Sequence, residues 1–413
     1  MRLGEVANAE AARYGKPLEG VRILAVEQMQ ALPWGTQLLA RLGAEVVKIE
    51  HPIDGESGRG SLPAMLDPQG RRVGSTYIRN NLNKKSVGID LKKGRELILD
   101  LAGKFDIFAE NFKPGAMKRM GLGYEDVSTR WPHVIYVSVS GFGNTVESPY
   151  SAWPAYAGVA EAMSGIYEFA RRDGQLPVIN PVGGLGDIGS AVMGVVGMLA
   201  ALRHRDHTGE GQYVDVAMYD SMISFTDIVT NYWSMGTPPK QGATPGLILT
   251  SVLASDGYFM VQVGRPHQFE RFCEIIGHPE WLTDPTYARD NWLAVLESHI
   301  RPAVETWAAD KKKRDICFLL AEGGVACAPV HHAEDVVNDE HVQRRNMLVE
   351  VPRTDGVEQP VLVPGNPVKM SKVQEGPEQR MPWVGEHTAQ ILSTELGLSE
   401  SELGKLREEG VIN

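Results

Sequence analysis

Short apolar segments alternate with helical patterns along the first half of the chain. Residues 21–26, 45–50, 107–110 and 134–138 are rich in Val, Ile and Leu and have the length of buried strands. Helical patterns at 33–42, at 94–103 and around Met117 lie between them. Strands that alternate with helices pair in parallel, because the helical crossover returns each strand in the same direction. We therefore predict an open parallel α/β sheet.

The pattern changes in the second half of the chain. A long apolar helix is expected at 189–203, a strand at 212–217 and a helix at 221–233, followed by a Pro/Gly-rich linker at 236–246. A second α/β region runs from 255 to about 330, and the tail holds a strand at 361–363 and a helix at 385–396. A chain of 413 residues exceeds one ordinary core. We expect a large Rossmann-like domain at 1–220, completed by a linker and return segment at 331–413, and a small α/β domain at 225–330.

Composition and charge narrow the classes of partner. Hydrophobic residues make up 43% and charged residues 23%, as in globular proteins, and no run of about 18 apolar residues is evident. The first 16 residues lack the apolar core of a secretory signal, and three cysteines suit a cytoplasmic protein. A net charge of −11 argues against binding to nucleic acid or anionic membrane. A phosphorylated ligand would need a local basic cluster, for which the candidates are Lys48, His51, Arg79, Lys84, Lys85, Lys113, Lys118 and Arg119.

Polar residues follow the predicted strands of the first domain. They are Gln28 to Gln30, Glu50-His51, Asn111-Phe112 and Ser140-Gly141. Ligands of open α/β sheets bind at the carboxyl ends of the strands, where these residues are expected to meet. The G-x-G-x-x-G fingerprint is missing after the first strand, which argues against an NAD enzyme.

Asp187 is a single carboxylate among glycines, in the segment GGLGDIGS at 183–190. Glycine allows a ligand to approach the backbone and leaves main-chain N–H groups available to an oxyanion. A nucleophilic carboxylate needs both conditions. The alternative interpretation is that Asp187 only caps the apolar helix that follows.

The chain resembles the class III CoA-transferases of the formyl-CoA transferase and carnitine CoA-transferase type. The resemblance runs from Leu18 to Leu396 and rests on segments in a specific order. These are Leu18–Leu24, Leu42–Glu50, Asn83–Ser86, Glu110–Gly115, Gly184–Asp187, Thr208–Gln212 and Gly385–Thr388. It implies CoA transfer from an acyl-CoA to a small carboxylic acid, an interlocked ring-like homodimer, and no metal or tightly bound cofactor.

The resemblance also assigns site residues. Asp187 matches the family's nucleophile, which forms an aspartyl anhydride and then an aspartyl-CoA thioester. CoA-contacting positions fall on Gln30, Ala31, His51, Ile89, Asn111, Phe112, Arg119, Met120 and Tyr156. The chain departs from the formyl-CoA enzyme at His51, which replaces an arginine, and at Pro154, which replaces a lysine. A glycine-rich loop is only partly present at 242–246. These departures leave the acyl specificity open.

Two other functions remain as alternatives. The first is an α-methylacyl-CoA racemase, which moves a proton between the His of a G-H-D-I-N-Y motif and an Asp that would correspond to Asp187. The His and the following Asp of that motif fall on Tyr156 and Ala157. A phenol with a pKa of about 10 is a poor base, and alanine carries no proton. The second is a non-catalytic CoA-binding protein, in which Asp187 is only a helix cap. Turnover with some donor and acceptor excludes the second, and exchange of the α-proton would support the first.

Overall fold

The computed structural model describes residues 1–168, 174–176, 183–227, 229–236 and 246–413. The chain divides into two compact units. One comprises Met1–Tyr167, Ile179–Ile228 and Glu340–Asn413, and the other comprises Glu168–Val178 and Val229–Asp339. Most of the predicted linker at 236–246 lies outside the described residues.

A parallel sheet of six strands forms the centre of the first unit, which confirms the predicted fold class. The strand order is β5-β2-β1-β6-β7-β8, and every neighbouring pair is parallel. The strands are β1 (Arg22–Val26), β2 (Glu45–Glu50), β5 (Lys85–Gly88), β6 (Ile107–Glu110), β7 (Ile135–Ser140) and β8 (Tyr213–Ala217). The edge strand β5 is not among the predicted strands, and its Lys-Ser-Val-Gly sequence is short and half polar.

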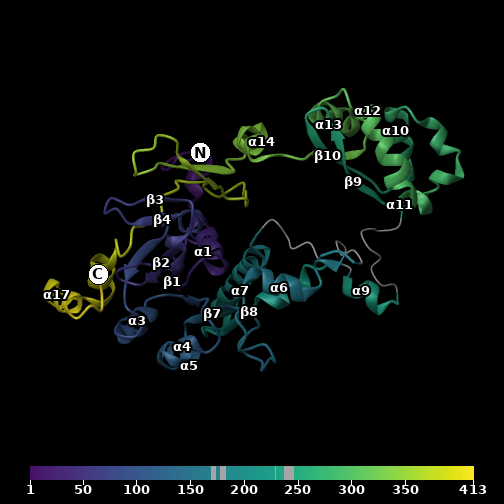
Figure 1. The fold of residues 1–413 in the computed structure, drawn as a ribbon. Helices are drawn as coiled ribbons and strands as arrows, with labels where there is room; N and C mark the ends of the chain where they lie inside the picture. The colour runs from purple at the N-terminus through teal and green to yellow at the C-terminus, as the bar shows by residue number, and fades with distance from the viewer. Residues whose placement is uncertain (169–173, 177–182, 228, 237–245) are drawn as a thin grey trace. The chain divides into compact units, whose positions relative to one another are not determined.

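Helices cover both faces of this sheet (Figure 1). Alternate residues of β1 enter different cores: Leu24 and Val26 pack on one face, and Ile23 and Ala25 on the other. The first face is covered by α3 (Arg95–Ala102), α5 (Tyr124–Arg130), α16 (Thr388–Leu396) and α17 (Glu400–Glu408). The second is covered by α1 (Ala31–Arg41), α6 (Ala157–Ser164), α7 (Leu185–Thr208) and α8 (Met218–Ser224).

The helix α7 starts earlier than the sequence predicts. Gly184 adopts a left-handed conformation (φ +79°) as the N-cap, so the helix begins at Leu185 and Asp187 lies in its first turn. The helix is also long and apolar enough to cross a membrane, which corrects the expectation that no such segment exists. Half of its most apolar window is buried, and it packs against α1 and α8, so its composition is that of a core helix.

The remaining residues of the first unit extend it beyond the sheet. The short hairpins β3 (Ala64–Leu66) with β4 (Arg72–Gly74) and β12 (Leu348–Val351) with β13 (Val361–Pro364) share a core with α2 (Ser75–Asn80). Near the end of the chain, Ile412 forms a β-bridge with Ile89.

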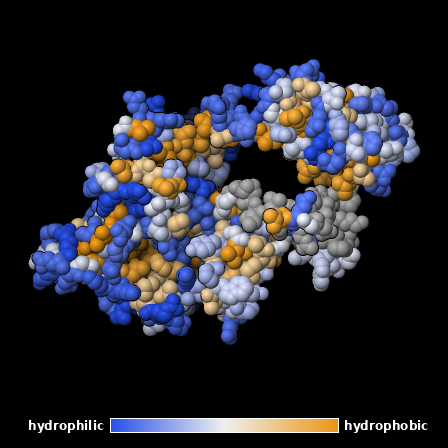
Figure 2. All heavy atoms as spheres, viewed as in Figure 1, coloured by the Kyte–Doolittle hydropathy of each residue, from blue (hydrophilic) through white to orange (hydrophobic). Residues whose placement is uncertain are grey.

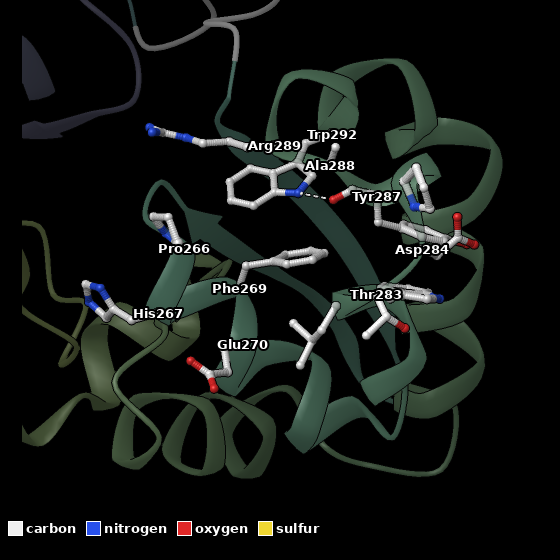
Figure 3. A pocket seen from close by; sticks show the side chains of 13 residues that line it. Pro266, His267, Phe269, Glu270, Thr283, Asp284, Tyr287, Ala288, Arg289 and Trp292 are labelled. Carbon is white, nitrogen blue, oxygen red and sulfur yellow. Dashed lines mark hydrogen bonds between the residues drawn. The ribbon is translucent and has the colours of Figure 1, made fainter.

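The second unit contains a three-stranded antiparallel sheet. Its strands are β9 (Ile248–Ala254), β10 (Gly257–Val263) and β11 (Ala326–Pro329), in the order β11-β10-β9. The helices α10 (Pro266–Ile276), α12 (Arg301–Ala308) and α13 (Lys313–Glu322) share its apolar core. An open cavity of about 740 Å³ lies over the buried rings of Phe269 and Trp292 (Figure 3). The Trp292 indole N–H donates to the carbonyl of Tyr287 at 2.9 Å.

Candidate active site

Asp187 lines a cavity of about 260 Å³ in the first unit, hereafter the Asp187 cavity. Of the predicted site residues, the cavity also brings together Gln30, Ala31, Asn111, Phe112 and Tyr156. They come from the N-terminus of α1, the loop after β6 and the start of α6. The larger cavity of the second unit contains none of the predicted site residues, so size alone does not identify the site.

Three glycines allow the elements around Asp187 to approach closely. A Cβ on Gly184 would lie 2.1 Å from Nε2 of Gln30, and one on Gly186 would lie 2.8 Å from the backbone of Ala157. A Cβ on Gly189 would lie 2.5 Å from the ring of Phe225. The glycines around Asp187 therefore allow close contacts of α7 with α1, α6 and α8, as well as access to Asp187.

The environment of Asp187 disfavours its charge. Burial raises the pKa of Asp187 to about 6, the nearby Glu161 carboxylate adds to the rise, and a side-chain hydrogen bond with Gln30 opposes it. The positive end of the α7 dipole also favours the ionised form. Asp187 is therefore a carboxylate at neutral pH and a stronger base than an exposed aspartate, as suits a nucleophile.

Arg79 sets the orientation of the Gln30 amide from the side opposite Asp187. Nη1 of Arg79 donates to Oε1 of Gln30 at 2.9 Å. Because Oε1 is occupied by this donor, Nε2 faces Gly184 and Asp187. Burial lowers the pKa of Arg79, and its guanidinium forms no ion pair among the described residues.

A buried network of charges supports the loop that carries Gln30. Lys84 lies 2.6 Å from Glu27, Lys48 lies 3.4 Å from Glu56, and Arg59 lies 2.6 Å from Glu50. All six side chains are less than a tenth exposed. Oε2 of Glu56 accepts the N–H of Met29 at 2.9 Å, which holds Met29 in a left-handed conformation (φ +61°). Gln30 follows as the N-cap of α1.

Asn111 ties the loop after β6 to the loop after β1. Its Oδ1 accepts the N–H of Gln28 at 2.8 Å, and its Nδ2 donates to the carbonyl of Gln28 at 2.9 Å. Glu110 holds the next residue, because its Oε2 accepts the N–H of Phe112 at 2.8 Å. Burial raises the pKa of Glu110 to about 7.

A second cavity of about 690 Å³, the His51 cavity, adjoins the first and shares Gln28, Ser57 and Phe112 with it. It is lined by three further predicted residues, namely His51, Ile89 and Met120. Ile89 is fully buried and also belongs to the core. Arg119 is exposed on α4 (Ala116–Arg119) and is not among the residues that line these two cavities.

The basic cluster expected from the sequence is only partly available to a ligand. Lys48 and Lys84 belong to the buried network, and Lys85 pairs with Glu45 at 2.6 Å. His51, Lys113, Lys118 and Arg119 are exposed, although Lys118 lies 3.9 Å from Glu125. Among the described residues no group of three potential metal ligands is found. Of the glycine-rich loop at 242–246, residues 242–245 lie outside the described residues.

The sequence did not point to Glu161 or Glu56 as parts of the site, and it offered Arg79 only as a candidate ligand of phosphate. Glu161 is 2% exposed, and its Oε1 accepts the N–H of Gly186 at 2.9 Å. This contact occupies one of the main-chain donors expected beside Asp187. The N–H of Ile188 is also used, by the carbonyl of Gly184. Glu161 is an isolated acid on α6, and no pattern in the sequence distinguishes it.

Asp187 thus lines a cavity together with residues that follow β1, β6 and β7, at the carboxyl ends of the strands, where open α/β sheets bind their ligands. The chain belongs to CoA-transferase family III, whose family model matches residues 18–388. It is 34% identical to a succinyl-CoA:mesaconate CoA-transferase of Haloarcula hispanica, covering 91% of this chain and 95% of the relative. It is 31% identical to a formyl-CoA:oxalate CoA-transferase of Streptomyces coelicolor, covering 96% and 99%.

The chain is also similar to a mammalian enzyme and to a protein of known structure. The chain is 32% identical to a succinyl-CoA:glutarate CoA-transferase of Mus musculus, covering 96% of this chain and 90% of the relative. A crystal structure of a CAIB/BAIF family protein from Brucella suis matches with a TM-score of 0.80 and 29% identity, covering 92% of this chain and 100% of the other. The chain is therefore an enzyme that transfers CoA between acyl-CoA and carboxylic acids, as the resemblance implied.

Proposed function

We propose that Asp187 carries the CoA transfer as a covalent nucleophile. Its position in the first turn of α7, at the wall of the Asp187 cavity, is the observation that supports this role most directly. The carboxylate attacks the thioester carbonyl of the donor and the C–S bond breaks. CoA departs as a thiolate, and a mixed anhydride of Asp187 and the donor acid remains. The thiolate then attacks the Asp187 carbonyl, which releases the donor acid and forms an aspartyl-CoA thioester. An acceptor carboxylate repeats these steps in reverse order.

The two adjoining cavities suggest how an acyl-CoA lies in the site. We place the acyl group in the Asp187 cavity and the nucleotide end of CoA in the His51 cavity, with Phe112 lining both. Gln30 then lies beside the reacting carbonyl as a hydrogen-bond donor to its developing oxyanion. We assign the phosphate groups to the exposed Arg119 and to Nε2 of His51, because Nδ1 of His51 accepts the N–H of Asp54 and lies 3.5 Å from its carboxylate.

The substrates are proposed as an acyl-CoA donor and a small carboxylic acid. The relatives named above use succinyl-CoA or formyl-CoA with mesaconate, glutarate or oxalate. A screen of acyl-CoA donors against mono- and dicarboxylic acids would identify the pair used by this chain.

The test of the nucleophile is Asp187→Ala. We expect transfer to be abolished while CoA still binds, and hydroxylamine to trap an activated carboxyl on Asp187 in the wild type during turnover. Undiminished transfer by the variant would refute the assignment. Exchange of the α-proton of a branched acyl-CoA without transfer would instead support the racemase.

We also propose a homodimer. The helix α7 exposes Val192, Val196 and Leu199, which are 37%, 58% and 38% exposed and recur at the spacing of one helix face. Apolar side chains reach the surface of this unit (Figure 2). A second copy covering this face would account for the exposure. A monomer at micromolar concentration in light scattering would contradict the proposal.

A further inference from the structure

Glu161 is a buried carboxylate in contact with the helical turn that carries Asp187. It belongs to α6 and is 2% exposed. Its Oε1 accepts the N–H of Gly186 at 2.9 Å, and its Oε2 accepts the hydroxyl of Tyr167 at 2.5 Å. No ion pair among the described residues includes Glu161. Within the part of the chain that the structure describes, its charge is therefore satisfied by hydrogen bonds and is not paired with a cation.

The placement of this carboxylate is fixed by close helix packing. The backbone of α6 approaches α7 so closely that a Cβ on Gly186 would lie 2.8 Å from Ala157. The first N–H groups of a helix have no acceptor within the helix. Glu161 supplies that acceptor to α7 from a neighbouring helix, one residue before Asp187.

We propose that Glu161 is a positioning residue for the transfer reaction. It anchors the first turn of α7 and keeps a second negative charge beside Asp187. The mixed anhydride joins Asp187 to the donor acid, and of the two parent carboxylates Asp187 is then the stronger base. This inference rests on the proposed covalent role of Asp187.

The relative basicity of the two carboxyl groups decides which way the anhydride reacts. Attack of CoA thiolate on the Asp187 carbonyl breaks its bond to the bridging oxygen, and the electron pair leaves with the donor carboxylate. Attack on the donor carbonyl expels Asp187 and returns the starting acyl-CoA. The weaker base leaves more readily, and an ordinary carboxylic acid has a pKa of about 4. Burial and Glu161 raise the pKa of Asp187 to about 6, so attack on Asp187 is favoured.

The other groups that face Asp187 do not supply this negative charge. Gln30 faces it from α1, with the Arg79 guanidinium of α2 behind the amide. Tyr156 at the start of α6 and Lys113 after β6 line the same cavity, and Met218 of α8 is apolar. Among the described groups, Glu161 is the anion whose charge raises the pKa of Asp187.

The experiment compares wild type with Glu161→Gln and Glu161→Ala. Glutamine keeps a carbonyl that accepts the N–H of Gly186, whereas alanine removes both the charge and the acceptor. Glu408→Gln is the matched control, because it removes one exposed carboxylate on α17. Each protein is labelled with [13Cγ]aspartate and titrated by NMR, and the Asp187 resonance is identified by its loss in Asp187→Asn. Transfer is measured against pH with the donor and acceptor pair found in the screen.

We expect the titration midpoint of Asp187 to fall by roughly one pH unit in both Glu161 variants and to stay unchanged in Glu408→Gln. The acid limb of kcat/KM should move by the same amount in Glu161→Gln, while kcat falls and CoA affinity changes less than about twofold. A purely structural role would leave the midpoint in place. An unchanged midpoint in either folded variant would overturn the inference. Absence of transfer by the wild type would refute the proposed function instead, and the titration would still be read independently.

Discussion

Asp187→Asn should stabilise the protein at neutral pH. The partly buried Asp187 carboxylate is held ionised in an environment that raises its pKa from 3.8 to about 6. A carboxyl whose pKa is higher in the folded than in the unfolded chain destabilises the fold when it is ionised. At 1.36 kcal/mol per pKa unit, the rise corresponds to about 3 kcal/mol, of which we expect about 2 kcal/mol in practice because the site is partly open to water. Asparagine has nearly the same shape and carries no charge.

The sign of this effect depends on pH. Above pH 6 Asp187 is ionised in the folded chain and the full cost is present; as the pH falls from 6 to 4 the carboxyl takes up a proton and the cost disappears. The gain from Asp187→Asn should therefore be about 2 kcal/mol at pH 7.5 and close to zero at pH 4.

Urea denaturation followed by tryptophan fluorescence at both pH values measures this difference. Asp310→Asn is a control, because Asp310 is exposed and its side chain pairs with the neighbouring Lys311. A variant no more stable than wild type at pH 7.5, or one equally stabilised at both pH values, would refute the reasoning about the site.

Three further substitutions test the parts that hold Asp187. Gly184 has a left-handed backbone, and Gly184→Ala would place a Cβ 2.1 Å from Nε2 of Gln30, so it should lower kcat at least about tenfold without loss of CoA binding. Gly158→Ala is the control, because its Cβ would meet no atom within 4 Å and the substitution should be neutral. Equal kinetics in the two variants would contradict the geometry. Arg79→Met frees the Gln30 amide and should lower kcat by about tenfold with partial recovery in Arg79→Lys; an unchanged kcat would show that Gln30 needs no orientation from Arg79. Asn111→Ala removes two hydrogen bonds to Gln28, worth about 1 kcal/mol each, and should raise KM for acyl-CoA by up to about thirtyfold, which initial rates would detect; an unchanged KM would argue against this link.

Much of the first unit could be predicted from the sequence because its strands are apolar and its helices are regular. The strands β1, β2, β6, β7 and β8 lie within a residue or two of their expected bounds. The pattern failed where local signals are weak or tertiary contacts decide. The helix expected at 221–233 is two helices, α8 and α9 (Val229–Ser234), and β9 and α17 were not expected at all.

The site could be predicted only where the chemistry is carried by one unusual residue. Asp187 stands out because glycines surround it, and Asn111 and Phe112 follow a strand directly. Glu56 and Glu161 reach the site from distant segments, and an isolated acid on an ordinary helix or turn has no distinctive pattern; Arg79 was expected near phosphate and instead donates to Gln30. Lys48 and Lys84 were candidates for binding phosphate, yet both are buried and form ion pairs with acids from distant segments. Their sequence context does not reveal these partners.

The network of Glu27, Glu50 and Glu56 with Lys48, Lys84 and Arg59 has a consequence for ionic strength. Mobile ions screen exposed charges within about 10 Å at 0.1 M salt but reach a buried, mutually neutral set poorly. The loop that presents Gln30 should therefore keep the same conformation at high and at low ionic strength. The CoA phosphates, which we propose to be bound by exposed cations, have no such protection, so added salt should weaken binding of acyl-CoA and leave kcat unchanged.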